Sequence, residues 1–482
     1  MNLSRSPSEF KWNFDLLICA AAVIIAPYFI FDAALRGVIG RSLFQTDWLV
    51  INLALARLTW ILLLPSRTNK KYQISNALQQ YYWIFILVFY TLFLTIIQPF
   101  LLDIHQVNSD LFETYSFTLK RGIKYVTYSI FSVYFFIISR QSKYHFDALL
   151  YSLVIGLCLA ELLGLIQALV FQISRIDIFP IIRTGSTEFK YISATVSFAG
   201  RSFLRINSIA HEPKGLASLI SFLAIFKLYW KNYCKTRVLG GKFLNKIDKY
   251  MCQTLWLSVL VILLTFSGSG LISCLPVFVI ISWRIMTNFL YLKISKIQLL
   301  ISYLLILILI IAITTYQNQS IEITLSFLDA AIYRRLGTFF EALDFESLYR
   351  SLDPEDGAFF FNLLKYPLIF LHGLGFGAFS NLSFDFVASQ YLQSNIDRLI
   401  SPFSRNILIE TVFSSGLVGC FIIFRFIRKY VFLSIRSIEG IHSAFLMFLA
   451  MNFFFRSNEF LFFIAIAMML SSLDKRTYAR PS

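Results

Sequence analysis

Five ionisable side chains of complementary chemistry, Arg201, Arg205, His211, Glu212 and Lys214, lie within one short segment of the chain. An arginine guanidinium binds phosphate oxygens through two parallel hydrogen bonds and keeps its proton, whereas a carboxylate can accept a proton from a hydroxyl group. Two arginines and a lysine beside a carboxylate therefore suit a site that holds a diphosphate next to a candidate base.

Structural explanations of the same residues also stay open. Glu212 precedes Pro213, a residue favoured in the first turn of a helix, and the helix dipole stabilises a carboxylate at that position. Capping alone explains Glu212, and a role as base or as substrate-orienting group is the alternative. The arginines, with Arg175 and Arg183 before them, equally suit pairing with acidic residues or lipid headgroups.

The composition indicates a polytopic membrane protein. Of the 482 residues 57% are hydrophobic and 15% are charged, whereas soluble proteins average about 25% charged residues. The net charge of +16 would suit nucleic acid in a soluble protein, but no basic domain separates from the hydrophobic stretches. We therefore expect no nucleic-acid partner, and the charge favours anionic lipid or a lipid-linked phosphate.

The cysteines and histidines predict neither a disulfide framework nor a metal site. Cysteines lie in apolar runs or in one basic segment, and the 5 histidines are scattered without the spacing of metal ligands. The acidic group of Asp353, Glu355 and Asp356 fits a turn with an Asp cap better than a cation site. We expect no metal and no cofactor.

Hydrophobic stretches long enough to cross a membrane, which takes about 20 residues, recur along the chain. About twelve candidates lie near residues 14–31, 43–64, 81–102, 122–139, 148–173, 209–230, 254–267, 270–283, 298–316, 406–424, 440–455 and 459–473. We predict an all-α fold with helices 1–9 in residues 1–316, a large loop at 317–405, and helices 10–12 and a tail in 406–482.

Lysine and arginine predict the orientation of these helices. The cations of alternate loops and of the C-terminal tail fall on one side, and such loops stay in the cytoplasm. Both termini are then cytoplasmic, and the loops near 103–121, 174–208 and 317–405 face outward. We expect the long loop to be partly helical over 332–348, and residues 366–379 to form an amphipathic or surface-lying segment that ends in a glycine-rich turn.

Some charged residues fit two roles. Glu161 in the fifth predicted span and Asp47 and Arg57 in the second are expected to pair with one another or with backbone across the bundle, and a proton relay is the functional alternative. Arg334 and Arg335 suit a second phosphate contact from the long loop, or a solvated helix face that pairs with nearby acidic residues.

Three segments, in this order, resemble motifs of the O-antigen polymerase and ligase superfamily of bacterial inner-membrane proteins. The first is an arginine followed by an apolar stretch, Glu-Pro and a helix, here residues 205–217, and the second is a short serine-containing turn between two spans, here 267–270. The third comprises Arg334-Arg335, Pro367, Gly373-Leu-Gly375-Phe-Gly377 and Ser404-Arg405-Asn406, followed by Gly416 and Gly419 in the next span. The resemblance covers roughly residues 200 to 420.

Two departures from the family pattern matter. The family's turn usually carries an arginine where this chain has Gly268, so that phosphate ligand has to come from elsewhere. The ligase branch places a histidine before the asparagine, where this chain has Arg405. The second departure favours a polymerase over a ligase.

The resemblance implies a GT-C-like membrane glycosyltransferase that needs no metal. It would join undecaprenyl-diphosphate-linked oligosaccharide units of an O-antigen, capsule or exopolysaccharide at the periplasmic face of the bacterial inner membrane. Glu212 and Arg205 would be the catalytic residues. The implied diphosphate ligands are Arg201, Arg205, Lys214, Arg334, Arg335 and Arg405. The membrane lipid and a chain-length regulator protein are candidate partners.

Two other functions stay open. One is an O-antigen ligase that transfers polysaccharide to the lipid A core. The other is a flippase or transporter of lipid-linked oligosaccharide, which predicts internal repeats and charges spread along several central spans.

The charge asymmetry makes the topology testable. A phosphatase that is active only outside the cytoplasm should be active when fused near residue 360 and silent when fused near residue 240, because only the segment around 240 is rich in lysine and arginine. The reverse pattern in cells would overturn the orientation.

Overall fold

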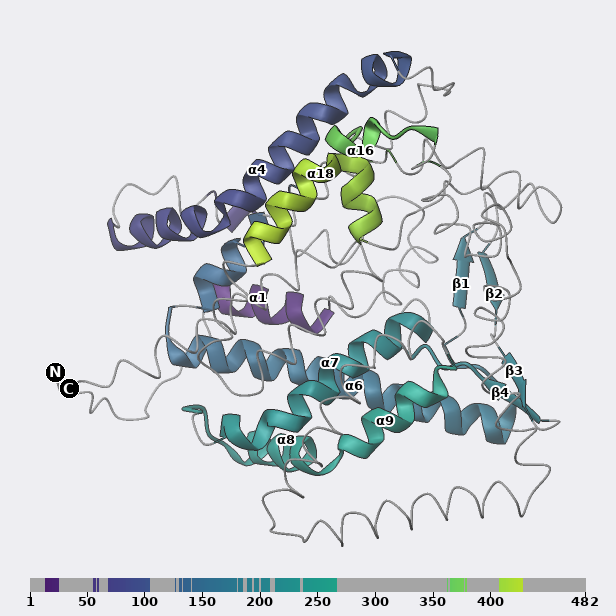
Figure 1. Cartoon of the computed structure of the whole chain (residues 1–482). Coiled ribbons are helices and arrows are strands. Elements are labelled where there is room, and N and C mark those ends of the chain that lie inside the picture. The colour runs from purple at the N-terminus through teal and green to yellow at the C-terminus, as the bar shows by residue number, and fades with distance from the viewer. Residues whose placement is uncertain are drawn as a thin grey trace, which may run out of the picture.

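This computed structural model describes the chain in separate stretches. They are residues 14–25, 55–57, 68–104, 133–139, 141–179, 181–184, 189–192, 195–198, 201–208, 213–234, 237–266, 365–376 and 407–427, with single positions between them. Figure 1 draws the elements of these stretches as ribbons.

Helices form most of the described chain. They are α1 (Phe14–Ile25), α4 (Thr68–Ile104), α6 (Lys143–Ser174), α7 (Pro213–Cys234), α8 (Lys242–Gln253), α9 (Leu255–Leu264), α16 (Ile369–His372) and α18 (Ile407–Ile427). Four short strands lie between α6 and α7: β1 (Ile181–Thr184), β2 (Phe189–Ile192), β3 (Thr195–Phe198) and β4 (Arg201–Leu204).

Two of these helices are long and apolar enough to cross a membrane. They are Tyr82–Ile104 within α4 and Lys143–Ser174, and α8 and α9 would count as a third span if that pair, bent by 65°, is one broken span. Both long helices confirm spans predicted at 81–102 and 148–173. The chain is therefore a membrane protein, whereas the total of twelve spans stays a prediction because most of the others lie wholly or partly outside the described residues.

The two faces of α4 differ as expected for a helix at the edge of a membrane bundle. Phe89, Phe93, Ile96 and Phe100 recur at helical spacing and are each about 60% exposed or more. Residues on the opposite face are buried: Ile84, Val88, Thr91, Thr95, Gln98 and Leu102. A long stripe of exposed aromatic and aliphatic side chains suits contact with lipid, because water would not favour it.

The α6 helix has defined ends. Ser142 is extended, and its hydroxyl accepts a hydrogen bond from the backbone N–H of His145 at 3.2 Å. At the other end Arg175 adopts a left-handed conformation with φ 59°, and its N–H donates to the Phe171 carbonyl at 2.9 Å. These caps bound a 32-residue helix, which rises roughly 48 Å along its axis.

The expectation of a purely helical fold is wrong between α6 and α7. β1 pairs antiparallel with β2, and β3 pairs antiparallel with β4, which makes two separate hairpins. Both hairpins lie to the right in Figure 1, beyond the end of α6. Each strand has four residues, which is too short for a clear alternation of apolar and polar side chains to appear in the sequence.

The main core lies where α1, α6, α7 and α9 pack together with β4 (Figure 1). Its fully buried side chains include Leu16, Phe135, Val154, Leu157, Ile206 and Ile220. These residues come from distant parts of the sequence, so the core fixes the end of β4 against the bundle of helices.

A second packing centre, which we call the glycine junction, joins α4, α16 and α18 at the top of Figure 1. It consists of residues 373–376, residues 413–416 of α18, and Thr95 of α4. The helical conformation of α18 breaks at Gly416, where φ is 61° and ψ is −159°. The N–H groups of Leu374 and Gly375 donate to the carbonyls of Phe413 and Ser414, each at 2.8 Å.

These hydrogen bonds explain how a broken helix is tolerated. The fourth residues after Phe413 and Ser414 lie beyond the break, so the carbonyls of the broken turn gain donors from another segment instead. Phe376 N–H also donates to the Thr95 hydroxyl at 2.9 Å. Residues 373–376 are buried, and just before them Leu368 and Leu371 are exposed whereas Ile369 and Phe370 are buried. The described part of this segment is therefore amphipathic, as expected, and its glycine-rich end lies inside the protein.

The junction leaves no room for a side chain at Gly375. An added Cβ would lie 2.5 Å from the backbone N of Thr95, and Gly375 has a φ of 87°. Gly375→Ala should lower the stability of the purified protein by about 1–3 kcal/mol from overpacking and by about 1–2 kcal/mol from the left-handed backbone. Thermal unfolding in detergent measures the loss.

Gly240→Ala is the matched control for that variant. A Cβ at Gly240 would meet nothing within 4 Å, so its unfolding temperature should equal that of the wild type. Equal unfolding temperatures for Gly375→Ala and Gly240→Ala would contradict the tight junction.

Candidate functional site

The sequence-predicted site residues differ in how far the structure describes them. Arg205 lies directly after β4 and is half-buried. Arg201 is the first residue of β4 and Lys214 the second residue of α7, and only their backbone positions are described. The others lie outside the described residues: His211, Glu212, Arg334, Arg335 and Arg405.

A glutamine in α6 fixes the segment that follows Arg205. The side-chain oxygen of Gln167 accepts hydrogen bonds from the backbone N–H of Asn207 at 3.1 Å and of Ser208 at 2.7 Å. Its side-chain nitrogen donates to Asn207 Oδ1 at 2.9 Å and to Asp177 Oδ1 at 2.8 Å. We call Gln167, Asp177, Asn207 and Ser208 the Gln167 clamp.

The Gln167 clamp is buried at its centre. Gln167, Asn207 and Ser208 have exposed fractions of 0%, 1% and 0%. The Ser208 hydroxyl donates to the Ala160 carbonyl at 2.8 Å, and a Cβ added to Gly164 would lie 3.6 Å from Ser208 Cβ. A small residue at 164 therefore lets the segment approach α6 closely.

Sequence reasoning missed the Gln167 clamp. The signal was present, because Gln167 is an uncharged polar residue inside the predicted span 148–173, and a polar group at that depth needs a partner. Gln167 carries no charge, so a prediction based on charged residues does not include it. Gln167 positions the backbone that carries Arg205, although the two residues are 38 positions apart in the sequence.

The end of α9 packs beside the segment that carries Arg205. Ile206 N–H donates to the carbonyl of Leu264 in α9 at 3.3 Å. The rings of Phe203 and Phe266 also lie together, with centroids 6.1 Å apart. The arginine segment is thus held against the end of α9 just before the Ser-Gly-Ser-Gly turn at 267–270, which itself lies outside the described residues.

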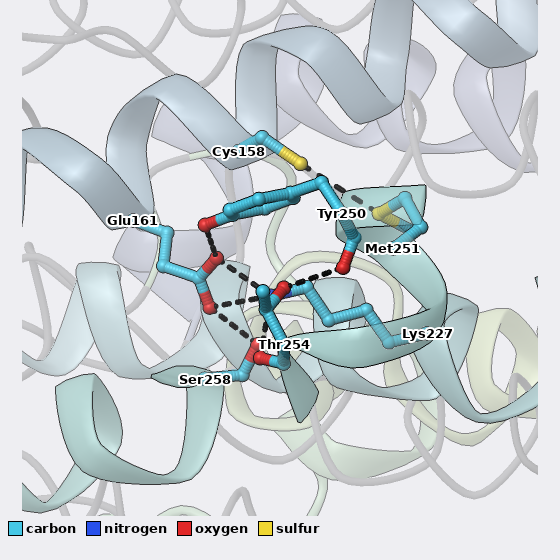
Figure 2. Close-up of polar contacts among 7 residues, drawn as sticks. All are labelled: Cys158, Glu161, Lys227, Tyr250, Met251, Thr254 and Ser258. Atoms are coloured by element: carbon cyan, nitrogen blue, oxygen red, sulfur yellow. Dashed lines mark hydrogen bonds and ion pairs between the residues drawn. The ribbon is translucent and has the colours of Figure 1, made fainter. Parts of the chain in front are cut away.

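A buried ion pair occupies the middle of α6. Lys227 of α7 donates to the Glu161 carboxylate oxygens at 2.8 and 2.6 Å, and both side chains have no exposed surface. The Tyr250 hydroxyl donates to one carboxylate oxygen at 2.6 Å and the Ser258 hydroxyl to the other at 2.5 Å. Figure 2 shows these three groups converging on the Glu161 carboxylate.

Lys227 also completes the joint between α8 and α9. Its ammonium group donates to the Thr254 carbonyl at 3.0 Å, at the residue that separates the two helices (Figure 2). Three oxygens then receive the three protons of the ammonium group. The pair is fully hydrogen-bonded, which is the condition under which two charges persist in an apolar interior.

Glu161 and Arg57 pair across the bundle, but neither with one another nor with backbone, as was expected of them. Glu161 pairs with Lys227, and Arg57 Nε donates to Asp15 Oδ1 at 2.7 Å. The Tyr134 hydroxyl donates to the same Asp15 oxygen at 2.8 Å. Asp47 lies outside the described residues.

A third polar group lies at the start of α6. Asp147 accepts hydrogen bonds from the Tyr233 hydroxyl at 2.6 Å and from the Val238 N–H at 2.8 Å. Asp248 of α8 accepts from Tyr151 and Trp230 and pairs with Arg237. Burial lowers the pKa of Arg237, but the contacts with Tyr151 and Asp248 more than offset it, so that pKa lies above its ordinary value.

Within the stretches that the structure describes, no three His, Cys, Asp or Glu side chains come together in a group able to hold a metal ion. The described thiols, among them Cys158 and Cys234, are all free. Metal-free chemistry stays a prediction, because most of the predicted site residues lie outside the described residues.

Comparison with known proteins identifies no relative. No protein-family model matches the sequence, and no curated protein matches it. The functional assignment therefore rests on the residues and on their geometry.

The ion pair should dominate the stability of the α6–α7–α9 core. Lys227→Met leaves a buried carboxylate without its cation and should lower the free energy of unfolding by about 3–5 kcal/mol. The double variant Glu161→Gln with Lys227→Met removes both charges and should be more stable than Lys227→Met alone. Thermal unfolding in detergent compares the wild type with these two variants, and a double variant no more stable than Lys227→Met would contradict the pair.

Proposed function

We propose that this chain is an integral-membrane glycosyltransferase of the O-antigen polymerase type. It would join oligosaccharide repeat units that are carried on a polyprenyl diphosphate such as undecaprenyl diphosphate. Its proposed place is the periplasmic face of a bacterial inner membrane, where such units are polymerised.

The observation that carries this proposal is the placement of Arg205. The arginine lies between two buried residues, Leu204 and Ile206, which are 3% and 0% exposed. The Gln167 clamp fixes the backbone just after it. The backbone of Arg205 is therefore firmly held, which suits the recognition of a diphosphate. A guanidinium that is already in place needs little rearrangement when negative charge develops on the leaving diphosphate.

The proposed reaction transfers a glycosyl group without an external oxidant or reductant. A hydroxyl oxygen of one repeat unit forms a bond to the anomeric carbon of the other chain, and the bond from that carbon to the diphosphate oxygen breaks. The hydroxyl proton passes to a base, for which Glu212 is the candidate, or to solvent. The polyprenyl diphosphate leaves with its added negative charge stabilised by arginine.

The remaining candidates have supporting roles in this proposal. Arg201 and Lys214 flank the Arg205 segment in the sequence and would contact the same diphosphate. Arg334 and Arg335 would reach it from the long loop, and Arg405 would support them. An arginine at 405 in place of the histidine of the ligase branch favours polymerisation over transfer to the lipid A core.

A second candidate function is transport of a lipid-linked oligosaccharide. The Glu161–Lys227 pair lies in the middle of a membrane-length helix, and α18 breaks at Gly416. Transporters use both buried charges and broken helices. Both features have their hydrogen-bonding needs met within the fold, so they also serve structure, and for that reason we rank transport second.

Replacement of Arg205 tests the proposed site. Arg205→Lys keeps the charge but loses the planar pair of donors, so it should not restore function. Purified Arg205→Lys and Arg205→Ala should each form polymer from lipid-linked repeat units at least about tenfold more slowly than the wild type, as expected when one ligand of the developing charge is lost. Gel electrophoresis of the product ladder measures the rate.

Arg175→Ala is the matched control. Arg175 is an exposed arginine of the same region, at the end of α6 and outside the motif, so its ladder should be normal. Normal ladders for both Arg205 variants would remove Arg205 from the site. Detergent micelles have no compartments, so polymer formation by the wild type in detergent excludes a pure transporter, and failure there together with lipid-linked oligosaccharide transport in vesicles would favour the second candidate.

A further inference from the structure

Three lysines of α8 form a stripe on the side of the helix that faces away from the protein. Lys242, Lys246 and Lys249 are all exposed, and their spacing of four and three residues places them on one side of a helix. None of them forms an ion pair with a residue that the structure describes. None of the described residues therefore neutralises their charge.

The opposite side of α8 is anchored in the protein. Asp248 accepts hydrogen bonds from the Tyr151 hydroxyl at 2.7 Å and from Trp230 Nε1 at 2.8 Å, and Met251 is fully buried. Asp248 is the one carboxylate in the sequence of α8 and is paired with Arg237. It therefore points inward, away from the lysine stripe, and does not neutralise it.

Exposed apolar side chains flank this stripe. Phe243 is 65% exposed within α8, Val238 is 48% exposed just before it, and Trp256 is 63% exposed in the first turn of α9. Aromatic side chains next to lysine are typical of helices that lie at the level of lipid headgroups. Large apolar side chains on the exposed side of a helix would be unfavourable in bulk water.

The joint between α8 and α9 argues against α8 as half of a transmembrane span. The two helices meet at 65°, and α9 is uncharged whereas α8 carries three lysines. Lysine is costly in hydrocarbon but stable at the interface. The joint is fixed because Lys227 binds the Thr254 carbonyl, so α8 is held at a set angle to the start of α9.

We propose that α8 lies at the membrane surface and that its lysine stripe binds the headgroups of anionic phospholipids. The phosphate of a headgroup complements the three ammonium groups, and the exposed side chains Phe243 and Trp256 would enter the boundary between headgroups and acyl chains. The site is distinct from the Gln167 clamp and does not depend on the proposed polymerase activity.

Lipid binding by the full-length protein tests this proposal. Native mass spectrometry of the purified protein, titrated with phosphatidylglycerol or phosphatidylcholine, gives an apparent dissociation constant for each lipid. A lysine near an anionic surface is worth roughly fivefold in affinity, so the triple change Lys242→Gln, Lys246→Gln and Lys249→Gln should weaken phosphatidylglycerol binding by about a hundredfold. Phosphatidylcholine binding should not change.

Two control proteins distinguish the loss of positive charge in α8 from a general effect of substitution on the protein. The triple Lys→Arg variant keeps the positive charge and should keep the affinity for phosphatidylglycerol. Lys365→Gln removes an exposed lysine next to α16 and should also bind as the wild type does. If the triple Lys→Gln protein does not assemble, Lys246→Gln alone should show the roughly fivefold loss of a single lysine.

Hydrogen exchange locates the effect. In nanodiscs that contain phosphatidylglycerol, the amides of residues 242–253 should exchange more slowly than in phosphatidylcholine alone, and the triple Lys→Gln variant should lose this difference. Equal phosphatidylglycerol affinity of the wild type and the triple variant would overturn the proposal. So would lipid protection confined to other segments, or binding of a soluble acidic protein with no preference for anionic lipid.

Discussion

The need of every buried polar group for a hydrogen-bond partner organises this protein around α6. The helix brings Asp147, Glu161 and Gln167 into the apolar interior, and all three are fully buried. At 1.5 Å per residue, Glu161 lies about 21 Å from Asp147 and about 9 Å from Gln167 along the axis. Hydrocarbon supplies no alternative partner, so each of these side chains determines what packs beside it: the loop before α8, the joint of α8 and α9, and the segment after β4.

This arrangement separates the electrostatic centre of the bundle from the candidate site. The Glu161–Lys227 pair is enclosed and has all its hydrogen bonds within the fold, which suits a role in fixing α7, α8 and α9 relative to α6. The Gln167 clamp lies nearer the end of α6 and holds a segment that continues toward Glu212 and α7. A rigid support of this kind is what a diphosphate site needs, since the position of its cations decides how well they stabilise a leaving group.

The glycine junction meets the same requirement mainly through hydrogen bonds between backbone groups. Gly416 breaks α18, and the N–H groups of Leu374 and Gly375 bind the carbonyls of the broken turn. Glycine is required because Gly375 has a positive φ and its Cα lies against the backbone of Thr95. The glycine-rich segment after α16 thus becomes part of the buried structure.

The sequence by itself determined the membrane character, the two long apolar helices and the cluster of cations around the start of α7. These are sums of local apolar and charged character over one segment, so a window of the sequence contains them. Only the tertiary structure decided that Glu161 meets Lys227, that Arg57 meets Asp15, and that Gln167 holds the backbone beside Arg205. Each of these contacts depends on which faces of distant helices pack together, and helix packing is a property of the whole bundle that no single window encodes.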